Sequence, residues 1–273
     1  MASNTIKTFI SWNVKGLNDR TKRFKILKHL KKLQTVAFLQ EAHIKQSDET
    51  SLVHNDSASP LDLPLSDVKG QTFVTKHVVR DPNSRFILLH RTWDTSVITL
   101  INIYAPTSDD PDFFASITAL LAKFHSSPIV MGGDFNKVLD PSLDKTGPKR
   151  HIPVRSLSAI AEIILDFQLL DIWRALHPLN KEFTFTSNPH KTCSCIDYFL
   201  IFHSLISKVT MAEILLQVIS DHSPIQLSCL LSPSFSLSSR WRLNGYMLQD
   251  PKIEHQIASM IEEFLDLNNT VNQ

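Results

Sequence analysis

Polar side chains suited to binding a metal ion or a phosphate recur at the ends of short apolar segments. Those that follow an apolar run are Asn13, Glu41, Tyr104, Asp134 with Asn136, and Asp221 with His222. Asp197 instead precedes its run, as an antiparallel partner strand would require to bring it to the same edge of a sheet. A buried strand favours Val, Ile, Leu and Phe, so a carboxylate at its end indicates a function that offsets its desolvation.

The carboxylates of this set would crowd one end of a sheet; they are Glu41, Asp134, Asp197 and Asp221. Unit charges about 4 Å apart repel by roughly 4 kcal/mol at an effective dielectric near 20. No Lys or Arg lies inside these segments, so a bound divalent cation is the simplest way to balance the charge. Oxygen donors from Asn, Asp and Glu favour Mg²⁺, with Mn²⁺ as a substitute, over zinc. The residues therefore predict a metal-dependent phosphodiesterase.

The composition is that of an ordinary globular protein. Of 273 residues, 42% are hydrophobic and 20% are charged, and the net charge is only +1, so the overall charge does not indicate nucleic acid. The three cysteines make no disulfide framework, and Cys193 with Cys195 lacks the second pair of a zinc site. Neither a signal peptide nor an apolar stretch of membrane-spanning length is visible. We expect an intracellular monomer with no membrane association and no small-molecule cofactor.

One domain followed by a tail is the simplest organisation. We expect the domain over residues 1–231, a Ser-rich linker over 232–240 and a helical tail over 241–273, where Ile253 and Ile257 recur at helical spacing.

Strands and helices are expected in mixed order. The expected strands are 6–13, 35–41, 73–80, 85–91, 96–104, 128–134, 183–187, 194–202, and 213–219 running into 224–230. The expected helices are 20–33, 111–125 and 153–169. Both direct and helix-linked connections between strands occur, which favours an α/β four-layer sandwich of two mixed β-sheets flanked by helices. The polar stretch 46–70 has no sustained period, which indicates loop or disorder. The basic residues of Arg20–Lys32 suit either a solvated helix face or phosphate contact.

Several motifs occur in the order typical of one superfamily. They are WNVKGLN, AFLQEAH, INIYAP, GGDFN, FTFTS, SCIDYFLI and SDHSP. With these motifs the chain resembles the endonuclease/exonuclease/phosphatase superfamily, and most of all the apurinic/apyrimidinic-like endonuclease domain of a vertebrate long-interspersed-element (LINE-type) retrotransposon. The tail SSRWRLNGYMLQD resembles the segment that comes after this domain in such elements. The resemblance implies Mg²⁺-dependent hydrolysis of the DNA backbone by a metal-activated water, with DNA as the partner and the nucleus as the location.

The resemblance also implies roles for single residues. Asn13 and Glu41 would hold the principal Mg²⁺, with Asp221 nearby. Asp134 would orient or deprotonate the attacking water, and Asn136 would donate a hydrogen bond to the phosphate.

The remaining implied roles concern the phosphate and the DNA strand. His222 would stabilise the phosphorane oxygens, and Asp197 would orient His222 and favour its charged form. Tyr104 would supply a hydroxyl near the scissile phosphate. The residues implied to contact the DNA backbone are Thr184, Thr186 and Ser194. One ion or two are both compatible with this set; a second site would use Asp134, Asn136 and His222.

The chain departs from the family pattern between Glu41 and Tyr104. Relatives carry a Gly-initiated apolar strand there, whereas this chain has LPLSDVKG. A missing inner strand would leave backbone groups of its neighbours unpaired; residues 73–79 are a candidate to replace part of it. Two functions therefore stay open: an active DNA endonuclease, and a catalytically impaired retrotransposon-derived remnant that still binds nucleic acid. A phosphoinositide phosphatase of the same fold is a third.

Overall fold

The computed structural model describes most of the expected domain. The described residues are 5–33, 35–43, 73–93, 96–124, 127–147, 154–187 and 189–231, together with His255, Ala258 and Ser259. Contacts within the chain divide it into two units, Met1–Leu237 and Ser238–Gln273. The expected loop 46–70 and the Ser-rich linker lie outside the described residues, so the domain boundary at residue 231 stays a prediction.

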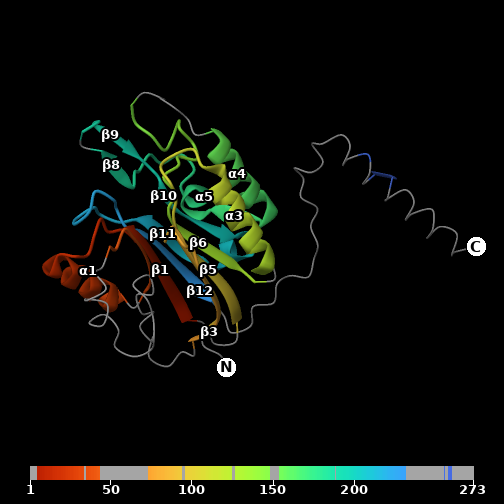
Figure 1. Ribbon diagram of the computed structural model, residues 1–273, viewed down its shortest axis with the longest axis horizontal. Coiled ribbons are helices and arrows are strands. Elements are labelled where there is room, and N and C mark those ends of the chain that lie inside the picture. Colours follow the sequence, from red (N-terminus) through yellow and green to blue (C-terminus); the bar gives the residue numbers. More distant parts are fainter. Residues whose placement is uncertain are drawn as a thin grey trace, which may run out of the picture. The chain divides into compact units, whose positions relative to one another are not determined.

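Two main sheets form the first unit (Figure 1). The four-stranded sheet has the order β11 (Val209–Ile214), β12 (Ile225–Leu231), β1 (Thr5–Asn13), β2 (Val36–Gln40). The six-stranded sheet has the order β3 (Phe73–Arg80), β4 (Phe86–Trp93), β5 (Ser96–Tyr104), β6 (Ile129–Asp134), β10 (Asp197–Phe202), β7 (Leu169–Asp171). A separate hairpin joins β8 (Phe185–Ser187) to β9 (Thr192–Ser194). The helical segments are α1 (Arg20–Leu33), α3 (Pro111–Leu121), η1 (Ala122–Phe124), α4 (Val154–Asp166), α5 (Ile172–Leu176) and η2 (His203–Lys208).

The alternation of side chains along each strand separates three apolar cores. On β5, Leu100 faces the core between the two sheets, whereas Ile101 faces the core beneath α3 and α4. On β1, Phe9 faces the core between the sheets and Ile10 faces α1. The result is the predicted α/β four-layer sandwich, with α3 and α4 covering one sheet and α1 the other. No helix among the described residues is long and apolar enough to cross a membrane.

One expected strand is wrong. The sequence pattern predicts a strand over 213–219, but β11 ends at Ile214, and Leu216 and Val218 are 86% and 78% exposed. Ile214 pairs with Ile225, the first residue of β12, so the residues after Ile214 have no partner strand to pair with. The apolar run is therefore a loop. The sequence pattern does not predict β7 and α5, because both are very short.

The region where the sequence departs from the family begins just after β2, and its residues 44–72 lie outside the described residues. In the described part of the chain, β2 is the last strand of that sheet. The segment β3 does not replace a strand beside β2, because it pairs with β4 at the edge of the other sheet. Whether residues 73–79 replace part of the family strand stays a prediction.

Two consecutive glycines allow β6 to pass close to its neighbours. A Cβ atom on Gly133 would lie 2.0 Å from the carbonyl oxygen of Ile103 on β5, and Gly133 has a φ of +154°. We expect Gly133→Ala to lower the free energy of unfolding by more than about 3 kcal/mol, measured by urea denaturation. The matched control is Gly16→Ala, because Gly16 has a φ of +82° but open space around its Cβ position. Equal losses in the two variants would contradict this account.

Candidate active site

Strand pairing brings the predicted polar residues together at one end of the sandwich. Tyr104 pairs with Asp134 across parallel strands β5 and β6, and Asp197 pairs with Asp134 across antiparallel strands β6 and β10. Asn13 and Glu41 come from the same end of the other sheet, at the end of β1 and just after β2. The reversed order of the Asp197 segment therefore has the predicted cause, which is an antiparallel strand.

Asp221 and His222 reach the site by a different route from the predicted one. They lie in the loop that precedes β12, and no strand leads into them. This loop is fixed to β1, because Ser220 Oγ donates to the Asn13 carbonyl oxygen at 2.7 Å and Trp12 Nε1 donates to the His222 carbonyl oxygen at 3.1 Å.

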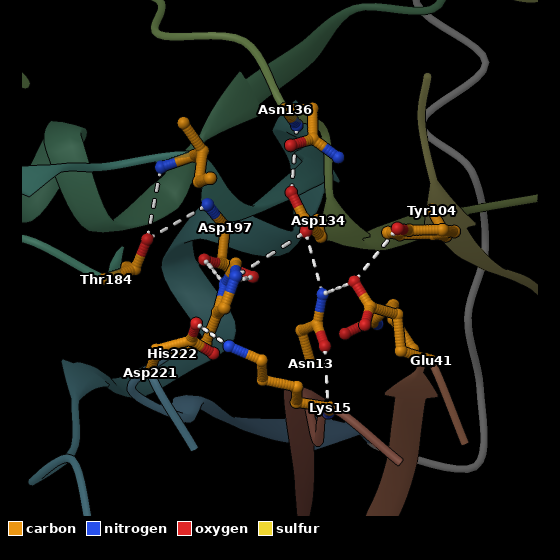
Figure 2. A network of polar contacts seen from close by, with 12 residues as sticks. Asn13, Lys15, Glu41, Tyr104, Asp134, Asn136, Thr184, Asp197, Asp221 and His222 are labelled. Carbon is orange, nitrogen blue, oxygen red and sulfur yellow. Dashed lines mark hydrogen bonds and ion pairs between the residues drawn. The ribbon is translucent and has the colours of Figure 1, made fainter. Parts of the chain in front are cut away.

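Asn13 joins carboxylates from both sheets (Figure 2). Its Nδ2 atom donates to Glu41 Oε1 at 2.9 Å and to Asp134 Oδ2 at 3.0 Å. The Tyr104 hydroxyl donates to the same Glu41 oxygen at 2.9 Å. Burial raises the pKa of Tyr104, and the hydrogen bond to Glu41 raises it further, so the hydroxyl keeps its proton at neutral pH. Glu41 is therefore oriented by two donors that act on one of its oxygens.

Asp134 is a buried carboxylate with an unusual proton affinity. Burial and the charge of Asp197 raise its pKa to about 7, although the positive charge of His222 acts in the opposite direction. Its Oδ1 atom accepts from the Asn136 backbone N–H at 2.9 Å. Asn136 has a φ of +50°, and its side-chain Nδ2 donates to the Ala105 carbonyl oxygen at 2.9 Å. Asp134 can therefore take up or release a proton near neutral pH.

His222 is paired with Asp197 in the interior. Its Nδ1 lies 2.9 Å from Asp197 Oδ2 and 3.1 Å from Asp197 Oδ1, and its ring lies 4.7 Å from that of Phe185. Burial lowers the pKa of His222, but the nearby carboxylates, Asp197 first, raise it to about 9. The ring therefore carries a positive charge at neutral pH, and its Nε2 lies 3.9 Å from Asp134 Oδ2.

Thr184 holds the start of β10. Its side chain is 1% exposed, and its hydroxyl oxygen accepts hydrogen bonds from the backbone N–H groups of Ile196 and Asp197, both at 3.1 Å. The resemblance implies that Thr184 contacts the DNA backbone, but this burial assigns it to positioning Asp197. Thr186 and Ser194 are half-buried on the β8–β9 hairpin.

The role of the Thr184 hydroxyl can be tested by isosteric substitution. Thr184→Val keeps the shape but leaves two buried N–H groups without their acceptor, so we expect it to cost about 1–3 kcal/mol of unfolding free energy. Thr184→Ser keeps the acceptor and should cost less. Thermal unfolding of both variants measures the difference; a Val variant as stable as the Ser variant would show that the hydroxyl contributes nothing.

Cys195 is a structural cysteine beside the site. Cys193, Cys195 and Cys229 are all free, and Cys195 is buried with its Sγ 3.8 Å from the Asp197 carbonyl oxygen. Burial raises the pKa of the Cys195 thiol well above its ordinary value. A protonated thiol in this environment is neither a metal ligand nor a nucleophile.

One charged residue of the site was missed by the sequence analysis. Lys15 places its Nζ 2.5 Å from Asp221 Oδ2 (Figure 2). Burial raises the pKa of Asp221, but the hydrogen bond and charge of Lys15 outweigh it and the net effect is a lowered pKa. Lys15 lies inside the WNVKGLN motif, two residues after Asn13. This position beside a predicted site residue could have indicated that Lys15 belongs to the site.

The donor set fits a divalent cation. Both donors to Glu41 act on Oε1, and no described group donates to Oε2. The ammonium of Lys15 against Asp221 shows that this edge of the site attracts positive charge.

A second group of donors lies beside Asp134. Asp134, Asp197 and His222 have donor atoms within 4.8 Å of one another, but a protonated His222 must lose a proton before it can bind a metal. Asn136 was the third residue of the expected second site, and its side-chain Nδ2 is engaged with the Ala105 carbonyl oxygen. The second site therefore stays a prediction.

Comparison with known proteins supports the fold and shows the family. Residues 10–222 match the Endonuclease/Exonuclease/phosphatase family, and the chain belongs to this family. A curated relative is the Transposon TX1 uncharacterized 149 kDa protein of Xenopus laevis, 33% identical over 156 residues. The match spans 55% of this chain but only 12% of that protein.

Solved structures share the fold. The AP endonuclease LMAP of Leishmania major is 18% identical with a TM-score of 0.64, covering 83% of this chain and 88% of that one. The 3′-5′ exonuclease NExo of Neisseria meningitidis is 18% identical with a TM-score of 0.59, covering 81% of this chain and 98% of that one. A structure of the 3′ phosphatase NExo from Neisseria bound to a product DNA hairpin has a TM-score of 0.57, with 18% identity over 81% of this chain and 98% of that one.

Proposed function

We propose that this chain is a Mg²⁺-dependent endonuclease that hydrolyses the DNA backbone and acts in the nucleus. The observation that carries the proposal is the joining of both sheets by one polar network, in which Asn13 contacts Glu41 and Asp134, and Asp197 pairs with His222. Family membership supports hydrolysis of a phosphoester. The structural neighbours include an AP endonuclease and a 3′ phosphatase bound to a DNA hairpin, which supports DNA as the substrate.

Asn13, Glu41 and Asp221 would hold the Mg²⁺ ion, for which Mn²⁺ could substitute. When bound, the ion lowers the pKa of water and offsets charge on the leaving oxygen. Lys15 would have to release Asp221 for all three residues to act as ligands, since it contacts that carboxylate in the structure.

The protein groups supply the proton transfers and the charge stabilisation. Asp134, whose pKa of about 7 lies near the working pH, accepts the proton of the attacking water. The charged ring of His222 donates a hydrogen bond from Nε2 to a phosphate oxygen as negative charge develops there, and Asp197 keeps the ring oriented. The second N–H of the Asn136 amide is a further donor for the phosphate, and the Tyr104 hydroxyl would have to leave Glu41 to become one.

Surface charge beside the site suits a polyanionic substrate. The first turn of helix α1 carries Arg20 and Lys22 and no acidic residue. Lys22 of this helix donates from Nζ to the Lys15 carbonyl oxygen at 3.1 Å, which brings the basic helix to the edge of the site. These basic residues would contact DNA phosphates without reading its sequence.

Cleavage of a labelled DNA duplex tests the proposal. The expected result is internal cleavage that requires Mg²⁺, with a 3′ hydroxyl and a 5′ phosphate at the nick; a parallel duplex with one abasic site measures abasic preference. Salt-sensitive DNA binding without cleavage would instead support the impaired remnant, which the departure from the family pattern between Glu41 and Tyr104 favours. Hydrolysis of inositol phosphates but not DNA would contradict the proposal.

A further inference from the structure

The backbone around Lys15 is held in an uncommon conformation. Lys15 has a φ of +47°, which non-glycine residues rarely adopt, and Gly16 follows with a φ of +82°. The Lys15 N–H donates to Asn13 Oδ1 at 3.1 Å, and the Gly16 N–H donates to the Glu41 carbonyl oxygen at 2.7 Å. The loop is therefore tied to both Asn13 and Glu41, the residues proposed to bind the metal.

This backbone conformation directs the Lys15 side chain at Asp221 across the site (Figure 2). The Lys15 side chain is 62% exposed and that of Asp221 is 28% exposed. The ammonium is also attracted by the charge of Glu41. A side chain so exposed can leave its carboxylate without disturbing the packing of the core.

We propose that Lys15 is a tethered counter-cation that competes with the divalent ion for Asp221. With no metal bound, its ammonium neutralises the carboxylate; to bind the ion, Asp221 must first give up this partner. The positive charge of the displaced ammonium stays on the same loop and continues to oppose the ion. Lys15 thereby raises the concentration of divalent cation that the site requires. This role presupposes the metal site of the proposed function.

The size of the effect follows from the exposure of the pair. Exposed ion pairs are weak, and repulsion between the ammonium and a divalent ion adds to the competition. We expect Lys15→Met to bind Mn²⁺ about three- to tenfold more tightly than the natural chain, because a factor of ten corresponds to about 1.4 kcal/mol.

Titration of the full chain with Mn²⁺ in the absence of DNA measures this directly, with free Mn²⁺ followed by electron paramagnetic resonance. Lys15→Gln is the second uncharged variant and should show the same gain. Lys15→Arg keeps the charge and should bind as the natural chain does. Lys25→Met removes a charge from the exposed face of α1 and should change the affinity by less than about twofold.

A double-variant cycle localises the competition. In an Asp221→Asn background the gain from Lys15→Met should shrink, because the contested carboxylate is gone. Unchanged or weaker Mn²⁺ binding by both uncharged variants, with unchanged circular dichroism, would overturn the role of Lys15 but not the metal site. Absence of Mn²⁺ binding in every variant and in the natural chain would overturn both the role of Lys15 and the proposed function.

Discussion

Asp134→Asn is expected to lower the rate of DNA cleavage by about 10³-fold while leaving the protein folded. The amide cannot accept a proton from water, whereas the buried carboxylate can. The substitution removes one accepted hydrogen bond, from either Asn13 or Asn136, but it also removes a buried charge close to that of Asp197. Single-turnover cleavage at pH 7.5 measures the change in cleavage rate, and thermal unfolding measures the change in stability.

The same variant has a distinct dependence of stability on pH. Because the pKa of Asp134 rises from 3.8 to about 7 on folding, the folded chain binds more protons than the unfolded chain between these values. The contribution of this group to stability therefore falls as the pH rises through that window. In EDTA, the free energy of unfolding of Asp134→Asn should not show this fall with pH.

An Asp134→Asn variant that cleaves DNA at the natural rate would show that Asp134 is not the proton acceptor.

His222→Gln is expected to lower the cleavage rate by about 10²- to 10³-fold, the usual effect of losing one donor that stabilises developing negative charge. The glutamine amide is neutral and lacks the second ring nitrogen that pairs with Asp197. The loss should appear in the maximal rate more than in the affinity for DNA, because the charge that His222 stabilises develops in the transition state.

Asp197→Asn provides the matched comparison for His222. It keeps the size of the side chain but removes the charge that raises the pKa of His222. We expect a similar loss of cleavage rate. The combined variant should be at most about threefold slower than the slower of the two single variants, because the two residues act as one unit. Fully multiplicative losses would contradict a shared role.

Much of the site could be predicted from the sequence because its residues end apolar strands. Asn13, Tyr104 and Asp134 are each the last residue of a buried strand, so the alignment of strand ends in the sheets brings them together. The reversed order around Asp197 correctly indicated an antiparallel strand beside β6. Strand periodicity carries this information because it depends only on neighbouring residues.

Contacts that depend on distant segments could not be predicted in this way. Lys15 and Asp221 are separated by 206 residues, and nothing in the local pattern of either indicates the other. The hydroxyl of Thr184 binds backbone N–H groups, which are present at almost every residue and leave no sequence signal. The loop before β12 has the sequence pattern of a strand, since an apolar run without a partner strand looks the same in sequence as one with a partner.

Relaxation of supercoiled plasmid tests whether this site hydrolyses DNA. Natural chain, Asp134→Asn and a no-protein control are incubated in Mg²⁺ and in EDTA, after circular dichroism has shown that both proteins are folded. We predict relaxed circles from the natural chain in Mg²⁺ alone, with the variant about 10³-fold slower. No relaxation by the folded natural chain, or equal relaxation by the variant, would contradict hydrolysis of DNA by this site.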